Sequence, residues 1–112
     1  MTEVNYKNTT IELSSIDGNW DYRTLFPDTR FADGLPISSI VFEPGGADTL
    51  VLRDGPIADL PPRFFKVTTY DSSDARKVDF YGMKKKVSLK YTDCTFSAGA
   101  CVIINLDDRR MF

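Results

Sequence analysis

Apolar side chains recur at every second position along much of this chain, and this alternation limits what it can fold into. The clearest case is Lys85–Thr92, where Val87, Leu89 and Tyr91 are expected to face a core while the residues between them face solvent. No segment carries apolar residues at helical spacing over three turns. The period of two therefore predicts a chain built from β-strands.

Six further segments have the same strand character. They are Thr9–Ser14, Ile37–Glu43, Asp48–Arg53, Phe64–Tyr70, Arg76–Tyr81 and Ala100–Leu106. Turn residues separate the later segments at short, regular intervals, as is typical of antiparallel sheets. We expect Ile37–Glu43 and Asp48–Arg53 to form a hairpin. Ala100–Leu106 is the most apolar segment, so we expect it to lie centrally in a sheet.

The choice of acidic residue supports the same fold class, because the chain contains thirteen Asp but only three Glu. Asp favours turns, since its short side chain bonds to nearby backbone groups, whereas Glu is a helix former. Three Asp-Gly pairs, which begin at Asp17, Asp33 and Asp54, mark turns directly.

About seven short strands predict an all-β fold, a single antiparallel β-sandwich or a jelly-roll-like barrel. The 112 residues form one domain that can bury a core without a metal or a disulfide. We expect residues 1–8 to be a polar N-terminal arm, residues 15–35 a long N-terminal loop, and residues 107–112 a C-terminal tail. The segment Gly55–Arg63 contains three prolines, so we expect it to project from the sheets.

The residue types in the chain argue against most catalytic chemistry. The chain has no histidine, which removes the commonest general base and a frequent zinc ligand. Cys94 and Cys101 are expected to be thiols, with a disulfide between them as the alternative, and no basic residue is placed to activate either one. The Asp-rich turns lack the spacing of a calcium loop. We therefore expect no catalytic residues, no metal and no cofactor, and a protein that is not an enzyme.

Charge and hydropathy limit the partners. A net charge of −2 and a pI of about 5.0 do not favour nucleic acid, which requires a clustered basic surface. No apolar run has the length of a secretion signal or a membrane span, so we expect a cytoplasmic origin and no membrane partner. The one basic run of three is Lys84, Lys85 and Lys86. It either keeps a sheet edge soluble or contacts an acidic neighbouring subunit.

Two further groups of residues are candidates for an interface. Trp20, Tyr22, Phe26 and Phe31 lie in a region where no strand period dictates aromatic residues. They either plug an open end of the sandwich, form a protein interface, or provide a platform on which sugars stack.

The C-terminus is the other group, and it consists of Arg109, Arg110, Met111 and Phe112. The terminal apolar pair follows four charged residues and lies beyond the last expected strand. It packs either on its own domain or on a neighbouring subunit, and the sequence leaves both alternatives open.

Parts of the chain resemble small virion proteins of tailed bacteriophages in size, strand pattern and turn usage over residues 33–106. The resemblance is carried by Ile37-Ser38-Ser39-Ile40-Val41-Phe42-Glu43-Pro44-Gly45, Asp48-Thr49-Leu50-Val51-Leu52-Arg53-Asp54-Gly55 and Thr95-Phe96-Ser97-Ala98-Gly99-Ala100-Cys101-Val102-Ile103-Ile104. It implies a structural role in the virion, which would be assembled in the host cytoplasm.

The leading expectation from this resemblance is a capsid decoration or cement protein. Such a protein binds the major capsid protein or other virion subunits, and it self-associates, commonly as a trimer. Weak contacts repeated by a closed oligomer become firm without any single strong site. The alternatives are a neck, tail or fibre component of the virion, or a carbohydrate-binding module that uses Trp20, Tyr22 and Phe26.

Overall fold

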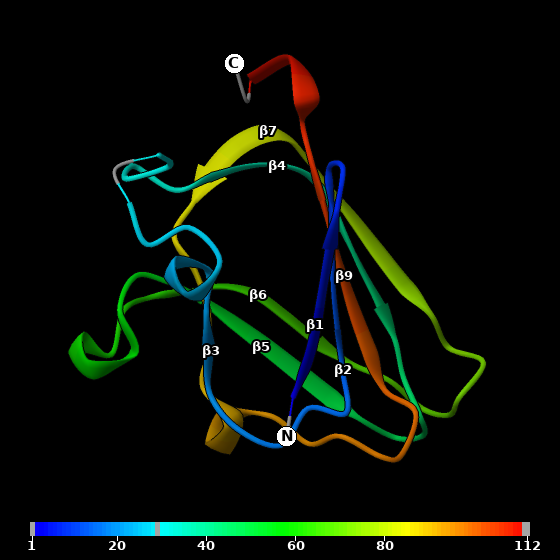
Figure 1. The fold of residues 1–112 in the computed structure, drawn as a ribbon. Helices are drawn as coiled ribbons and strands as arrows, with labels where there is room; N and C mark the ends of the chain where they lie inside the picture. The colour runs from blue at the N-terminus through cyan, green and yellow to red at the C-terminus, as the bar shows by residue number, and fades with distance from the viewer. Residues whose placement is uncertain (1, 29, 111–112) are drawn as a thin grey trace.

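Nine strands form two antiparallel sheets that pack face to face in the computed structural model, which describes residues 2–28 and 30–110 (Figure 1). The strands are β1 (Glu3–Lys7), β2 (Thr10–Ser14), β3 (Trp20–Asp21), β4 (Leu35–Glu43), β5 (Thr49–Asp54), β6 (Arg63–Thr68), β7 (Arg76–Lys85), β8 (Val87–Leu89) and β9 (Cys101–Leu106). One sheet has the order β1-β2-β9-β4-β7 and the other β3-β8-β5-β6. The predicted all-β sandwich is confirmed.

The helical elements of the described residues are four short 3-10 turns. They are η1 (Tyr22–Thr24), η2 (Ile57–Asp59), η3 (Tyr91–Asp93) and η4 (Asp108–Arg110). In this part of the chain, no helix has the length and apolar character needed to cross a membrane.

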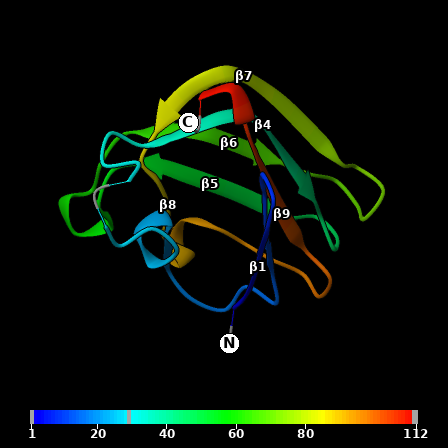
Figure 2. The ribbon, with the colours of Figure 1, turned by 45° about the horizontal axis from the view of Figure 1, so that its top comes forward.

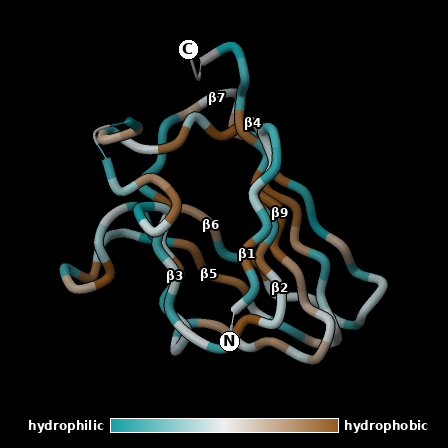
Figure 3. The backbone as a smooth tube through the Cα atoms, in the orientation of Figure 1, coloured by the Kyte–Doolittle hydropathy of each residue, from teal (hydrophilic) through white to brown (hydrophobic). Residues whose placement is uncertain are grey.

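The core lies between the sheets and is built from alternate residues of the strands. Its fully buried members include Ile11, Leu13, Ile40, Phe42, Leu50, Leu52, Val102 and Ile104, each 0% exposed. Figure 3 shows hydrophobic residues concentrated in the strands and hydrophilic ones mainly in the connections. Strand β9 lies between β2 and β4, so its predicted central position is confirmed. Each fully buried aliphatic side chain contributes about 1.5–3 kcal/mol to stability.

The predicted hairpin of Ile37–Glu43 and Asp48–Arg53 is wrong, because the two strands belong to different sheets. Strand β4 pairs with β7 and β9, whereas β5 pairs with β6 and β8. The connection between them therefore carries the chain across the sandwich rather than back along one sheet. Alternating apolar residues indicate a strand and the face that it buries. They do not indicate which sheet the strand joins, because strands of both sheets of a sandwich have the same pattern.

Two segments expected to lack strands contain them. Residues 3–7 of the expected arm form β1, which pairs antiparallel with β2 at one edge of the larger sheet. The sequence of β1 is polar because only two of its five residues face the core. These are Val4 and Tyr6, which lie opposite the buried β2 residues Leu13 and Ile11. The expected loop over residues 15–35 contains β3 and η1.

The segment Lys85–Thr92 is also divided differently from the expectation. Strand β7 continues to Lys85, β8 follows after one residue, and Tyr91 begins η3 with its side chain 38% exposed. Ser88, expected to face solvent, is 0% exposed, and its hydroxyl donates to the Gly55 carbonyl at 2.7 Å. The buried hydroxyl therefore has the acceptor it needs.

Gly45 provides a test of the connection between β4 and β5. A Cβ atom at this position would overlap the carbonyl oxygen of Ala98, so an alanine requires the backbone to move. We expect Gly45→Ala to lower the free energy of unfolding by about 1–3 kcal/mol in urea denaturation. Gly18→Ala is the control, since a Cβ there meets nothing within 4 Å. Equal stability of the two variants would contradict the close approach.

Candidate functional site

The aromatic residues that were candidates for an interface belong to the hydrophobic core or pack against it. Trp20, Tyr22 and Phe26 are 5%, 1% and 2% exposed. The Tyr22 hydroxyl donates to the Phe31 carbonyl at 2.9 Å, and the ring centres of Phe26 and Phe31 lie 4.8 Å apart in an edge-on contact. Tyr6 of β1 packs edge-on against Phe26. Because the rings of Trp20, Tyr22 and Phe26 are buried, they form neither an exposed protein interface nor a sugar-stacking platform, whereas Phe31 is only partly buried.

The three lysines of the basic run lie at the end of an outermost strand. Lys84 and Lys85 end β7, the last strand of its sheet, and Lys86 leads into β8. The Lys85 ammonium lies 3.9 Å from the Asp54 carboxylate and 5.6 Å from the centre of the Phe64 ring. The Lys86 N–H donates to Asp54 at 2.7 Å. Of the three lysines, only Lys84 is exposed. It lies near the end of an outermost strand, where a lysine discourages pairing with another strand.

The C-terminal group is placed only in part. Arg109 lies in η4, and its guanidinium pairs with the buried Asp107 carboxylate at 3.3 Å. Arg110 ends the same turn. Met111 and Phe112 lie outside the described residues. The structure does not bring the aromatic residues, the lysines and the C-terminus together into one site.

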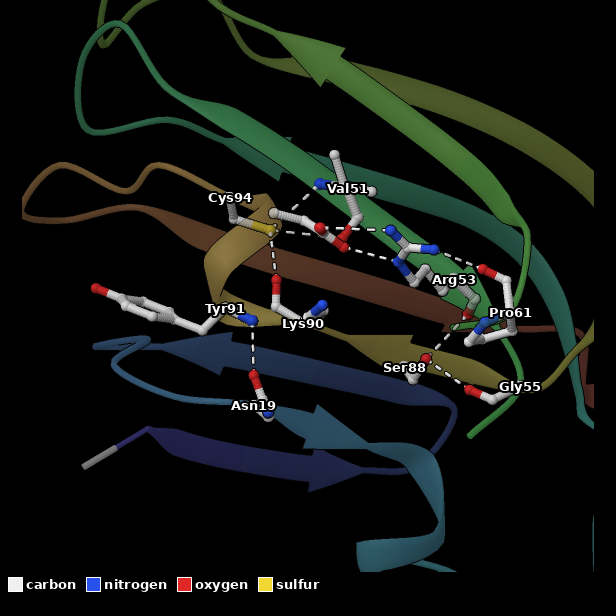
Figure 4. Close-up of polar contacts among 10 residues, drawn as sticks. Asn19, Val51, Arg53, Gly55, Pro61, Ser88, Lys90, Tyr91 and Cys94 are labelled. Atoms are coloured by element: carbon white, nitrogen blue, oxygen red, sulfur yellow. Dashed lines mark hydrogen bonds and ion pairs between the residues drawn. The ribbon is translucent and has the colours of Figure 1, made fainter. Parts of the chain in front are cut away.

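A cluster of polar contacts holds the segment after β8 against the outer face of β5 (Figure 4). Arg53 donates from Nε to Asp93 at 2.7 Å and from Nη1 to the Pro61 carbonyl at 2.7 Å. Cys94 lies over Val51, whose N–H is 3.4 Å from Sγ. Arg53 and Asp93 are forty positions apart, so no local sequence pattern indicates their contact. Because the Arg53 guanidinium already donates to Asp93 and Pro61, it is not free to bind an anion, and the cluster stabilises the fold.

The two cysteines are free thiols, as expected. Burial raises the pKa of the Cys94 thiol. Burial, together with the nearby Glu12 and Glu43 carboxylates, raises the pKa of Cys101 to about 12. Both thiols are therefore protonated near neutral pH, and neither has the environment of a nucleophilic thiolate. Within residues 2–28 and 30–110, no group of three or more Cys, Asp or Glu side chains is arranged to hold a metal ion.

Strand β7 lies at the rim of the sandwich (Figure 2) and exposes several large apolar side chains. Val78 is 43% exposed, Tyr81 83% and Met83 54%. We call these three residues the β7 edge. Exposed apolar groups on an outermost strand are typical of protein interaction sites, because the strand also offers unpaired backbone groups.

A bulge in the middle of β7 turns Tyr81 outward. Asp79 pairs with Ser39 and Met83 pairs with Ile37, so three residues of β7 lie opposite a single residue of β4. Tyr81 has a φ of 55°, a left-handed conformation that costs a residue with a Cβ about 1–2 kcal/mol. The bulge was not expected, because the predicted strand ended at Tyr81, although a Gly inside a strand, here at position 82 of β7, is a known signal for a bulge.

Comparisons of the chain with protein-family models, with curated proteins and with solved structures find no match. The function must therefore be inferred from the surface and from the contacts described above.

The strained conformation of Tyr81 leads to a stability test. We expect Tyr81→Gly to raise the free energy of unfolding by about 0.5–1 kcal/mol, because glycine adopts this backbone conformation freely and the exposed ring loses little packing. Tyr70→Gly is the matched control, since Tyr70 is 82% exposed but has no left-handed backbone. It is expected to be slightly destabilised. Urea denaturation measures both, and a loss of stability in Tyr81→Gly would argue against strain at the bulge.

The contact between Arg53 and Asp93 predicts a pH dependence. The hydrogen bond from Arg53 holds the pKa of the Asp93 carboxyl below its ordinary value. A carboxyl with a lowered pKa in the folded state contributes stability above its unfolded pKa of about 4, and loses it as the pH falls through the folded value. Asp93→Asn should therefore be less stable than wild type at neutral pH. The difference should shrink in acid when urea unfolding is followed from pH ~7 to pH ~3.

Asp59→Asn is the control for this measurement, because it removes a carboxylate from the exposed η2 turn. It should follow the wild-type pH profile closely. If Asp93→Asn and wild type differed by the same amount at every pH, the ion pair would not be the source of the acid sensitivity.

Proposed function

We propose that this protein is a structural subunit of a tailed-phage particle, of the capsid decoration type, which binds the head surface and self-associates. The observation that carries the proposal is the β7 edge, where Val78, Tyr81 and Met83 expose apolar surface on an outermost strand. Edge strands and apolar patches of this kind bind other proteins through backbone hydrogen bonds and side-chain contacts.

The rest of the domain supports a binding role because its loops are tied to the sheets. Arg53 holds both the η3 segment and the proline-rich segment through Asp93 and Pro61. The η2 turn lies in that proline-rich segment, and Leu60, which follows the turn, is 62% exposed. A surface fixed before binding loses less conformational entropy when it docks. Such a surface suits a protein that bridges neighbouring subunits.

The assignment to a phage head rests on the resemblance of residues 33–106 to small virion proteins. A neck, tail or fibre component is the alternative of the same class, since it requires the same kind of exposed edge. The carbohydrate-binding alternative required Trp20, Tyr22 and Phe26 to form an exposed platform, and all three are buried.

The first experiment determines whether the chain is part of a particle. We expect the protein in purified virions of the phage that carries its gene, in many copies per head, when separated heads and tails are analysed by quantitative mass spectrometry. Recovery with tails alone would support the neck, tail or fibre alternative. Absence from both fractions would contradict the proposal.

The second experiment tests the β7 edge. Met83→Asp should weaken rebinding of the purified protein to heads that lack it by about tenfold or more, because a charge replaces an apolar contact. Val4→Asp is the control, since Val4 is also exposed, at 36%, but lies on β1 at the opposite edge of the sheet. If both variants bound as wild type does, another surface would contact the head.

A further inference from the structure

We infer that the N-terminal half of β7 pairs with the same segment of a second copy of this chain, so that two copies share one continuous sheet. This pairing would provide the self-association in the proposed function, and the inference rests on that function. Three features of β7 support this pairing: an open edge, the exposed side chain of Val78, and opposite charges on the residues before and after it.

The N-terminal half of β7 is an open edge. Strand β7 is the last of its sheet, so one side of its backbone has no strand partner among the described residues (Figure 1). Sheet edges are normally protected by bulges and lysines. In β7 the bulge and two of the lysines, Lys84 and Lys85, lie in the C-terminal half, whereas the N-terminal half carries Lys77 with Asp79 on the same face. Residues 76–79 pair with β4 in regular register and carry no bulge.

Val78 in this half of β7 is only partly covered by the rest of the chain. Val78 lies opposite Ile40, which is 0% exposed, and directly opposite residues point to the same face of a sheet. Val78 therefore points to the core side of β7, yet it remains 43% exposed. Phe80, two residues further on, packs against Phe64 of β6 with ring centres 5.6 Å apart. The Val78 side chain thus lacks the cover that Phe80 has, and a second Val78 can supply it.

When two copies of this segment pair antiparallel, the charged residues beside Val78 in one copy face opposite charges in the other. Lys77 and Asp79 lie on the outer face, 63% and 51% exposed, with Nζ and Oδ1 3.8 Å apart. When two copies pair antiparallel about Val78, each Lys77 lies opposite Asp79 of the other copy. Opposite charges at directly facing positions stabilise a strand pair, whereas a parallel pair in the same register would place like charges together. The segment is therefore complementary to itself in the two-fold arrangement.

The expected dimer is weak in dilute solution. A strand pair of this length buries much less than the roughly 800 Å² per partner of a stable interface. Association should therefore be visible only at high protein concentration, although a particle that holds copies side by side would strengthen it. The two-fold contact also replaces the three-fold expectation, because a strand edge used by one partner is not free for another.

Charge reversal at the two flanking positions tests the contact by sedimentation velocity over a range of protein concentrations up to about 1 mM. Lys77→Asp places Asp opposite Asp, and Asp79→Lys places Lys opposite Lys, so each variant alone should dimerise at least about tenfold more weakly than wild type. An equal mixture of the two should dimerise again, since every facing pair is then opposite in charge. An unfolded variant would not give this recovery.

Lys7→Asp is the matched control, because it reverses an exposed charge on β1, the other edge of the same sheet. It should dimerise as wild type does. The inference is overturned if wild type stays monomeric to about 1 mM, if it forms trimers, or if the mixture fails to associate. A protein found in virions but monomeric would refute only this inference. A dimer absent from virions would refute only the proposed function.

Discussion

The buried carboxylate of Asp48 fixes the corner at which the chain passes from one sheet to the other. Asp48 is 1% exposed and accepts hydrogen bonds from the Gly45 N–H at 2.9 Å and from both the N–H and the hydroxyl of Ser97 at 2.8 and 2.7 Å. Its own N–H donates to the Thr69 hydroxyl, which donates to the Gly46 carbonyl. Three connections thus meet at one residue, two of them at its carboxylate and the third at its backbone N–H. In this buried setting each bond is strong, and losing one would leave the carboxylate short of a donor.

This corner explains which parts of the fold the sequence could predict. All seven segments with alternating apolar residues contain strands, because burial of one face dictates the period of two. The choice of partner strand depends instead on contacts such as that of Asp48 with Ser97, forty-nine positions away. Strand β1 was missed because an edge strand needs few apolar residues, here Val4 and Tyr6. Burial of Trp20 was one of three open alternatives, since an aromatic residue suits a core, a protein interface or a sugar-stacking platform.

The candidate site was predictable only in part, and for a related reason. The sequence pointed to Lys84 and Lys85 as protection for a sheet edge, and they do end an outermost strand. It gave no indication that Val78 would be exposed, because Val78 follows the same alternation as buried residues. Phe64 of β6 packs against Phe80, whereas Val78 stays 43% exposed, and such cover depends on how the two sheets pack and not on the pattern of one strand.

The two halves of β7 differ in a way that would favour one partner, the same segment of a second copy, over other strands. The bulge at Tyr81 and the following lysines hinder pairing along the C-terminal half, while the regular half carries charges that accept the same segment in one orientation. In the proposed dimer a short pair of this kind is weak, so we expect free copies to stay apart in dilute solution. On the proposed particle surface, which would hold copies close together, the same contact would gain from their high effective concentration. Weak self-pairing at an open edge is therefore consistent with a subunit that assembles on its target and not before it.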